Sequence, residues 1–207
     1  GIGIAYGHVP AFIMTLGTNT ILRGVIMLYN NGKPVLNLSE QYQAIGSGYL
    51  GKIPIPVIIL IAVLLLGWFI LNKTRFGRHV LAVGGNEQAA RVSGINTKLV
   101  KITVYIMSGI FSAIAGMIIS ARVNAGSPTL GTGYENDAIA AAVIGGTSMM
   151  GGQGSMIGTI GGILIIGVMN NGLDLLNVSS YYQQVAKGII IIAAVLFDML
   201  SKSRKSK

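Results

Sequence analysis

Two long stretches without a charged residue constrain this chain more than any other feature of its sequence. Residues 53–72 and residues 102–121 each run for 20 positions without Asp, Glu, Lys or Arg. A helix needs about 20 apolar residues to cross the hydrocarbon core of a bilayer. The segment between them, residues 75–95, contains three arginines and one glutamate, so we expect it at one membrane face. We call this segment the polar island.

Composition places the whole chain in the same class. The apolar fraction is 52%, the mean hydropathy is +0.67 and only 10% of residues are charged, against about 25% in soluble domains. These values indicate an integral membrane protein. The 30 glycines predict close packing of helices, especially along two repeats of small residues: Ser112, Gly116, Ser120 and Gly154, Gly158, Gly162.

The net charge of +9 reports orientation and does not indicate a nucleic-acid surface. Ten of the 15 lysines and arginines lie in or beside the polar island or in the C-terminal tail, residues 201–207. Because cytoplasmic loops of membrane proteins are enriched in Lys and Arg, both segments are predicted to be cytoplasmic. The ten residues are Lys73, Arg75, Arg78, Arg91, Lys98, Lys101, Lys202, Arg204, Lys205 and Lys207.

The polar island carries the signals of one short helix. Gly84 and Gly85 break the preceding segment, Asn86 is a good N-cap, Glu87 suits the positive end of a helix dipole and Gly94 is a good stop. The pattern predicts a helix over residues 86–93. The alternative is a solvated loop with a single helical turn.

The N-terminal part contains one predicted spanning helix with a polar face. Pro10 opens residues 11–29, whose polar residues Thr15, Thr18, Asn19 and Thr20 either bond to neighbouring helices or line a wet cavity. Residues 30–52, with Asn-Asn-Gly and Pro34, read as an extracytoplasmic loop. Pro54 and Pro56 suit the start of the next helix.

Parity of membrane crossings predicts a broken segment in the C-terminal half. If the island and the tail are both cytoplasmic, the chain between them crosses an even number of times, yet only three long apolar stretches are present: 102–121, 155–171 and about 183–200. Residues 134–144 are the one remaining candidate and are too short to span. We expect a half-helix continued by Gly-rich chain, which membranes tolerate only where protein or a water-filled cavity satisfies the backbone.

Glu135 and Asp137 stand at the beginning of this half-helix. They either contact a cation or sugar hydroxyl at the mouth of a pathway or simply cap the helix. No enzyme constellation accompanies them: His8 and His79 lack metal-ligand spacing, and no nucleophile or phosphate-binding motif is present. The candidate pathway residues are Thr15, Asn19, Tyr134, Glu135, Asn136 and Asp137.

Three stretches resemble a known family. GSPTLGTGYENDAIAAAVIGGTSMMGGQGSMIGT, NNGLDLLNVSSYYQ and a last helix ending in VLFD resemble the permease subunits of bacterial ABC importers for ribose and related monosaccharides, in the group that also holds branched-chain amino acid permeases. GRHVLAVGGNEQAARVSGI resembles the loop by which such permeases engage their ATPase, and PAFIMTLGTNTILRG resembles a membrane segment of the family. Asn136 departs from the pattern, because the family more often has an apolar residue there.

The resemblance implies an all-α polytopic helix bundle in the cytoplasmic membrane of a bacterium. It has about six crossings, one of them the broken half-helix, and a short cytoplasmic coupling helix. The expected organisation is a single permease domain over 1–207, incomplete at its N-terminus, with a coupling loop at 75–97, a broken, re-entrant segment at 122–154 and a basic tail at 201–207. The residues expected to contact the ATPase are Gly84, Gly85, Asn86, Glu87, Ala90, Arg91 and Gly94.

The implied function is translocation of a monosaccharide by alternating access, without enzyme activity, cofactor or metal in this chain. ATP would be used by a separate ATPase subunit. The other implied partners are an extracytoplasmic sugar-binding protein and a second permease copy. The alternatives are an ATP-independent channel, a membrane-embedded enzyme, or an ABC permease for another substrate such as an amino acid.

Overall fold

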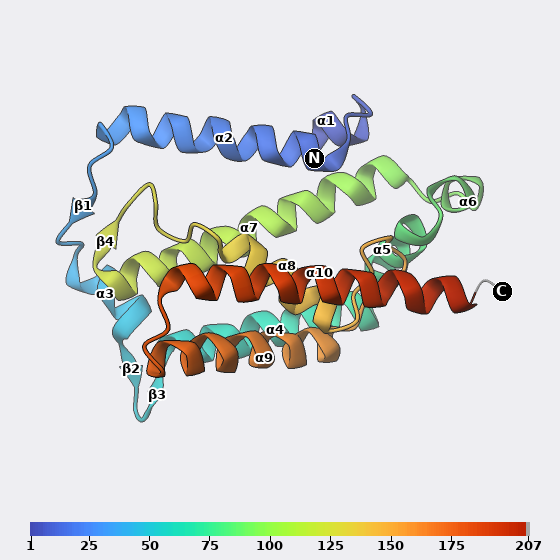
Figure 1. The fold of residues 1–207 in the computed structure, drawn as a ribbon. Helices are drawn as coiled ribbons and strands as arrows, with labels where there is room; N and C mark the ends of the chain where they lie inside the picture. Colours follow the sequence, from blue (N-terminus) through green and yellow to red (C-terminus); the bar gives the residue numbers. More distant parts are fainter. Residues whose placement is uncertain (206–207) are drawn as a thin grey trace. The chain divides into compact units, whose positions relative to one another are not determined.

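The computed structural model describes residues 1–205 and is dominated by long helices (Figure 1). Within that range four helices are long and apolar enough to cross a membrane: α2 (Ala11–Asn30), α4 (Ile55–Lys73), α7 (Thr97–Val123) and α9 (Met156–Leu175). A fifth, α10 (Ser180–Lys205), is apolar over Ser180–Leu196. The most apolar parts of α2, α4 and α7 contain no buried residue, as expected where lipid is the solvent. The all-α polytopic membrane class is therefore confirmed.

Shorter elements connect these helices. The helices are α1 (Ile2–Ala5), α3 (Glu40–Ser47), α5 (Arg75–Gly85), α6 (Glu87–Val92) and α8 (Tyr134–Ile144), and the strands are β1 (Val35–Leu36), β2 (Tyr49–Leu50), β3 (Ile53–Pro54) and β4 (Ala125–Gly126). β1 pairs antiparallel with β4, and β2 pairs antiparallel with β3. The chain divides into two compact units, one of Gly1–Gly67 with Gly94–Thr132 and one of Trp68–Ser93 with Gly133–Lys207. The predicted tail, 201–207, lies outside the residues whose side chains the structure describes.

In the first unit, α3 packs against the C-terminal end of α7 (Figure 1). The phenol of Tyr42 and the hydroxyl of Ser120 share a hydrogen bond of 2.7 Å, and Gly46 lies directly against the backbone of Ala121 and Arg122. The prediction of a loop over residues 30–52 is wrong in this part. The helix is too short to be stable alone, and its contacts with α7 stabilise it.

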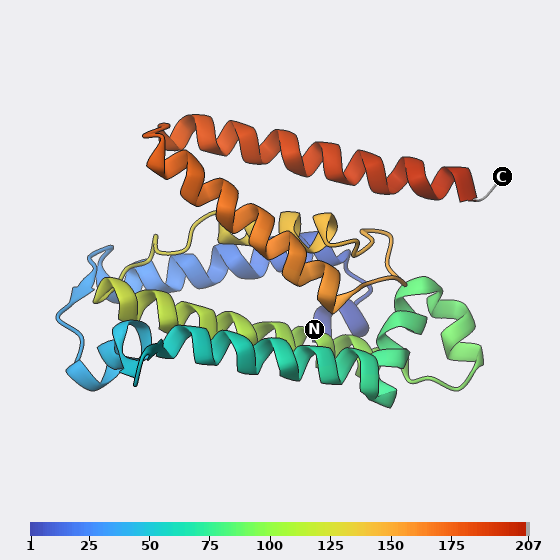
Figure 2. The same ribbon diagram turned by 90° about the horizontal axis from the view of Figure 1, so that it is seen from below.

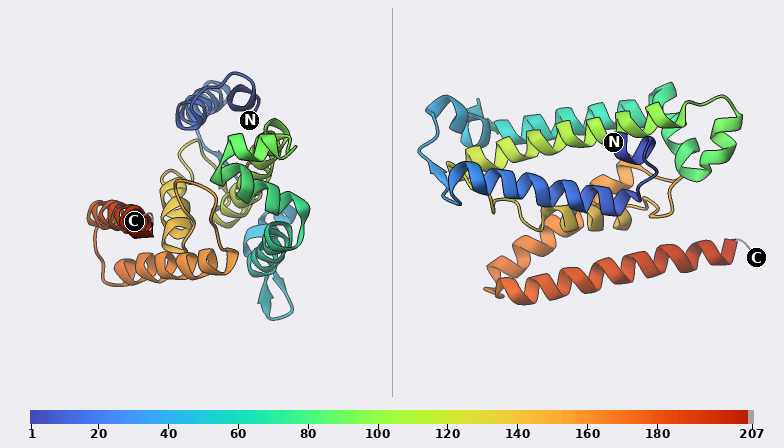
Figure 3. Two further views of the ribbon diagram at one scale, coloured as in Figure 1. Left: turned by 90° about the vertical axis from the view of Figure 1, so that its right-hand side faces the viewer. Right: turned by 90° about the horizontal axis from the view of Figure 1, so that it is seen from above.

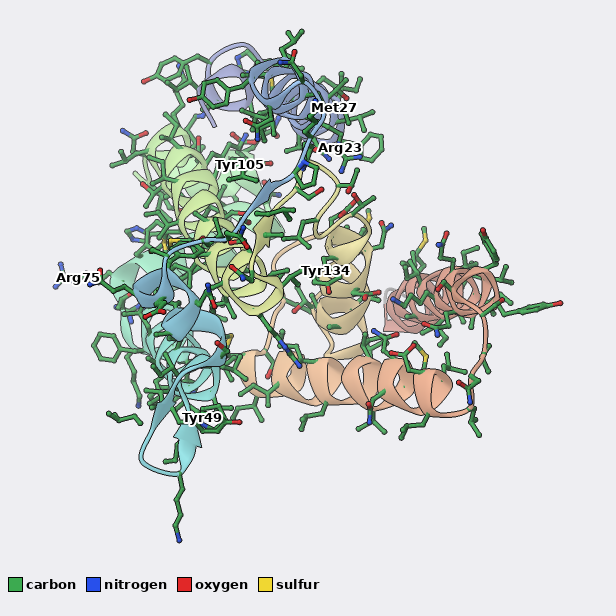
Figure 4. All side chains as sticks on the ribbon, turned by 90° about the vertical axis from the view of Figure 1, so that its left-hand side faces the viewer. Arg23, Met27, Tyr49, Arg75, Tyr105 and Tyr134 are labelled. Atoms are coloured by element: carbon green, nitrogen blue, oxygen red, sulfur yellow. The ribbon has the colours of Figure 1, made fainter. Side chains whose placement is uncertain are left out.

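The polar face of α2 is satisfied mainly within the helix. The hydroxyls of Thr15, Thr18 and Thr20 donate to carbonyls one turn earlier at 2.9, 2.7 and 3.0 Å. Arg23, labelled on α2 in Figure 4, donates to the Thr132 hydroxyl at 3.2 Å. These threonines therefore need no neighbouring helix as a hydrogen-bond partner.

In the second unit, α8 packs against both α9 and α10 (Figure 3, left), while α9 and α10 run in opposite directions (Figure 2). A side chain added at Gly158 or Gly162 of α9 would collide with the carbonyl oxygens of Gly145 or Ala141. One of the two predicted stripes of small residues therefore packs closely. In the other stripe, Gly116 has no neighbouring atom within 4 Å of its hypothetical Cβ.

The predicted half-helix is confirmed with its expected bounds. α8 has 11 residues and is about 16 Å long at 1.5 Å per residue, roughly half of the 30 Å hydrocarbon core. Ala140 and Ala141 pack with Ile166 of α9 in a small buried cluster. Small side chains on α8 thus allow the short helix to lie close to its neighbour.

Candidate functional site

The polar island forms two capped helices. Thr74 caps α5 by accepting a hydrogen bond from the Gly77 N–H at 3.1 Å. Gly84 and Gly85 are the last residues of α5, so the prediction that they break the preceding segment is confirmed. That segment is itself a helix, which was not predicted from the sequence.

The predicted second helix of the island is present as α6. The side chain of Asn86 accepts a hydrogen bond from the Ala89 N–H at 2.9 Å, as expected for an N-cap. Glu87 and Arg91, one turn apart, approach to 3.8 Å. The helix ends at Val92, and Gly94 follows with φ of +83°, a conformation that favours glycine.

The side chains of α6 divide into an inner and an outer face. Ala90 is only 5% exposed and lies on the inner face. The side chain of Arg91 is 61% exposed. Val92 is 89% exposed and was not among the residues predicted from the sequence.

The C-terminal end of α5 touches the loop between α8 and α9, backbone to backbone. A Cβ on Gly84 would lie 2.8 Å from the backbone nitrogen of Gly152, and a Cβ on Gly151 would meet the Gly84 carbonyl. A Cβ on Gly152 would lie 2.6 Å from the Gly85 Cα. Figures 1 and 2 show this orange loop beside the green α5. The four glycines therefore form a contact with no room for a side chain at Gly84, Gly151 or Gly152, which we call the glycine contact.

The glycine contact relates the chain after α8 to the membrane face of the polar island. It brings residues 151–152, which follow α8, against the polar island, so both must lie at the same membrane face. If α7 crosses the membrane from that face, the chain has to return across it by the end of α8, as the parity argument predicts. The contact therefore supports a crossing by the broken segment.

A charged cluster joins the N-terminal parts of α8 and α10 to the C-terminal part of α9. The ammonium of Lys187 donates to Asp137 Oδ2 at 2.9 Å, and the side-chain amide of Asn170 donates to the same oxygen at 3.3 Å. The side chains of Lys187 and Asp137 are 24% and 20% exposed. We call these three residues the polar cluster.

The other predicted pathway residues are placed differently. Glu135 accepts a hydrogen bond from the Gly133 N–H at 3.0 Å and so caps its own helix. Asn136 and Tyr134 are exposed, and Figure 4 labels Tyr134 at the start of α8 beside α9 and α10. Thr15 and Asn19 belong to the first unit, on α2.

The family model for the permease component of branched-chain amino acid transport systems matches residues 1–195. The chain belongs to this family. The relatives of this permease component include the ribose import permease proteins of Haemophilus influenzae and Bacillus subtilis, 46% and 48% identical over 99% and 96% of this chain. The L-arabinose transport system permease protein of Escherichia coli is 40% identical over 99% of this chain.

The chain spans 65%, 62% and 62% of the length of these three relatives. No solved structure matches this permease component. The membership and the spanning helices confirm the expected localisation, a multi-pass protein of a bacterial cytoplasmic membrane.

Sequence reasoning missed Asn170 and Lys187 of this permease component, although a signal was present. Lys187 is a single charge in the apolar helix Ser180–Leu196, and an ionisable residue inside a spanning segment marks a functional site by default.

Among the described residues no group of three or more His, Asp or Glu side chains is placed to hold a metal. A cavity of about 330 Å³ in the first unit is lined by Ile4, His8, Val9, Ala11, Lys101 and Tyr105.

Proposed function

We propose that this permease component translocates ribose or a similar monosaccharide by alternating access, driven by a separate ATPase subunit. The names of the relatives support a sugar, because ribose and L-arabinose permeases match almost the whole chain. The family description points to branched-chain amino acids, which makes an amino acid the competing substrate. The proposed partners are the ATPase, an extracytoplasmic sugar-binding protein and a second permease copy.

The observation that carries the proposal is the connection between α6 and the broken segment. α6 is capped by Asn86 and ends at Val92, shortly before Gly94. The side chains of Arg91 and Val92 are exposed. α5 and α6 belong to the same compact unit as α8, α9 and α10. The glycine contact joins this helix pair to the loop that follows α8. A displacement of α6 would therefore reach the broken segment without passing through a flexible side chain.

This arrangement suits a coupling helix. ATP binding by a partner shifts the permease between two states only if the partner contacts these states differently. A short capped helix transmits displacement as a rigid body, and Glu87, Arg91 and Val92 supply the polar and apolar contacts on its surface. In this proposal the partner ATPase subunit, and not this chain, binds and uses ATP.

The direct test is reconstitution of the complete permease in liposomes with its binding protein, with and without its ATPase. Labelled ribose should accumulate only when the ATPase and ATP are present, and unlabelled arabinose should compete better than leucine. Ribose flux of equal size without ATP would show a channel. Uptake of leucine in preference to ribose would assign the amino-acid substrate instead.

A further inference from the structure

The polar cluster contains two acceptors without a donor. Asp137 Oδ2 receives hydrogen bonds from both Lys187 and Asn170, yet Asp137 Oδ1 and Asn170 Oδ1 have no hydrogen-bond partner among the described residues although both atoms are buried. A buried polar atom without a hydrogen bond is costly, and such atoms are rare in native proteins. The two oxygens therefore require hydrogen-bond donors from outside these three residues.

The charge of the cluster restricts what those donors belong to. Asp137 is negative and Lys187 is positive at 2.9 Å, so the pair is neutral as a whole and offers little attraction to a free cation. The Lys187 ammonium has three N–H groups, of which one donates to Asp137. The cluster thus combines two free acceptors with further donors, which matches a neutral molecule that carries several hydroxyl groups.

Asn170 and Lys187 lie more than one turn from the ends of their helices, whereas Asp137 lies in the first turn of α8. Asp137 is the fourth residue of α8, Asn170 is five residues before the end of α9, and Lys187 is the eighth residue of α10. At 1.5 Å per residue, Lys187 lies about 10 Å from the first residue of its helix. Polar and ionisable side chains at such depth face a bundle interior or a water-filled path.

We propose that Asp137, Asn170 and Lys187 form a hydroxyl-binding site for the transported sugar. Asp137 Oδ1 and Asn170 Oδ1 accept hydrogen bonds from two sugar hydroxyls, and Lys187 donates to a sugar oxygen. The ion pair holds the carboxylate in place and cancels its charge, so a neutral sugar is bound and then released. This inference rests on the proposed function as a sugar permease.

The first experiment removes the Asn170 amide, both its unpaired oxygen and its hydrogen bond to Asp137, and leaves the ion pair intact. In the variant Asn170→Leu, the leucine side chain has nearly the same shape as that of asparagine. Asn171→Leu is the matched control, because Asn171 is exposed on the same helix. In the complete reconstituted transporter, Asn170→Leu should lower ribose uptake at least about tenfold, a barrier change of roughly 1.4 kcal/mol. It should also reduce the preference for ribose over 2-deoxyribose, whereas Asn171→Leu should alter neither. Equal behaviour of the two variants would overturn the site.

The second experiment separates substrate binding from a purely structural ion pair. Asp137→Lys combined with Lys187→Asp reverses the pair and retains the attraction between α8 and α10. We expect the double variant to recover thermal stability relative to Asp137→Lys alone but not ribose uptake. Recovery of uptake together with stability would show that the pair only holds the helices. Absence of ribose uptake in the wild-type transporter would instead contradict the proposed function.

Discussion

Replacing Gly84 by alanine should lower sugar uptake by the complete transporter about tenfold or more, while the same replacement at Gly85 should leave it within about twofold. The two residues are neighbours at the end of α5, and alanine favours the helix at both. Only at Gly84 does the new Cβ lie 2.8 Å from the backbone nitrogen of Gly152, whereas at Gly85 the nearest atom is 3.6 Å away. The substitution at Gly84 therefore separates α5 from the loop that follows α8.

A second pair of glycines controls for backbone strain. Gly151 and Gly146 have φ of +85° and +84°, so alanine is strained at both. A Cβ on Gly146 meets nothing within 4 Å, while a Cβ on Gly151 meets the Gly84 carbonyl. Gly151→Ala should lose uptake as Gly84→Ala does, and Gly146→Ala should retain more. Equal uptake within each pair, at equal amounts of inserted protein, would show that the glycine contact carries no coupling.

Gly94→Pro should abolish uptake, to about a hundredth of the wild-type rate or less, while the protein still inserts into the membrane. Gly94 has φ of +83°, whereas proline fixes φ near −65°. Proline also disfavours helical conformation in the preceding residue, and Ser93 has φ of −75° and ψ of 8° at the end of α6. The chain would leave α6 in another direction and misplace Glu87, Arg91 and Val92.

The control for this position is Gly94→Asn, since asparagine tolerates positive φ and the hypothetical Cβ meets no atom within 4 Å. Uptake by Gly94→Asn should stay close to wild type, and membrane insertion should be the same for both variants. ATP hydrolysis stimulated by the loaded binding protein should fall only in the proline variant. Normal uptake by Gly94→Pro would show that transport does not require a fixed conformation at the end of α6.

The membrane architecture was largely predictable from the sequence because its causes are local. Charge-free stretches of membrane length predicted α4 and α7, and the residues around Asn86 and Gly94 predicted α6. The half-helix α8 followed from counting crossings, and its bounds agree with the prediction. Each of these features depends on hydropathy, capping or chain length, which neighbouring residues determine.

The features that could not be predicted depend on contacts between distant segments. α3 depends on the packing of Gly46 and Tyr42 against α7, and the close approach of the loop after α8 to the end of α5 depends on the missing side chains of Gly84, Gly151 and Gly152. Asp137 was recognised as a candidate, but its partners are 33 and 50 residues away. Propensity treats a charge as a surface residue, and this rule fails where tertiary packing decides.

The most direct test of the account asks whether α6 and the broken segment move as one body. Spin labels would be attached at the engineered pair Gln88→Cys and Met150→Cys, both at exposed positions of the second unit, in a complete transporter without other reactive cysteines; these 207 residues contain none. The distance between the labels in the complete transporter should be narrowly distributed and the same without nucleotide and with bound ATP, and it should broaden when Gly84→Ala is added. A shift of several ångströms on ATP binding in the wild-type background would contradict the account.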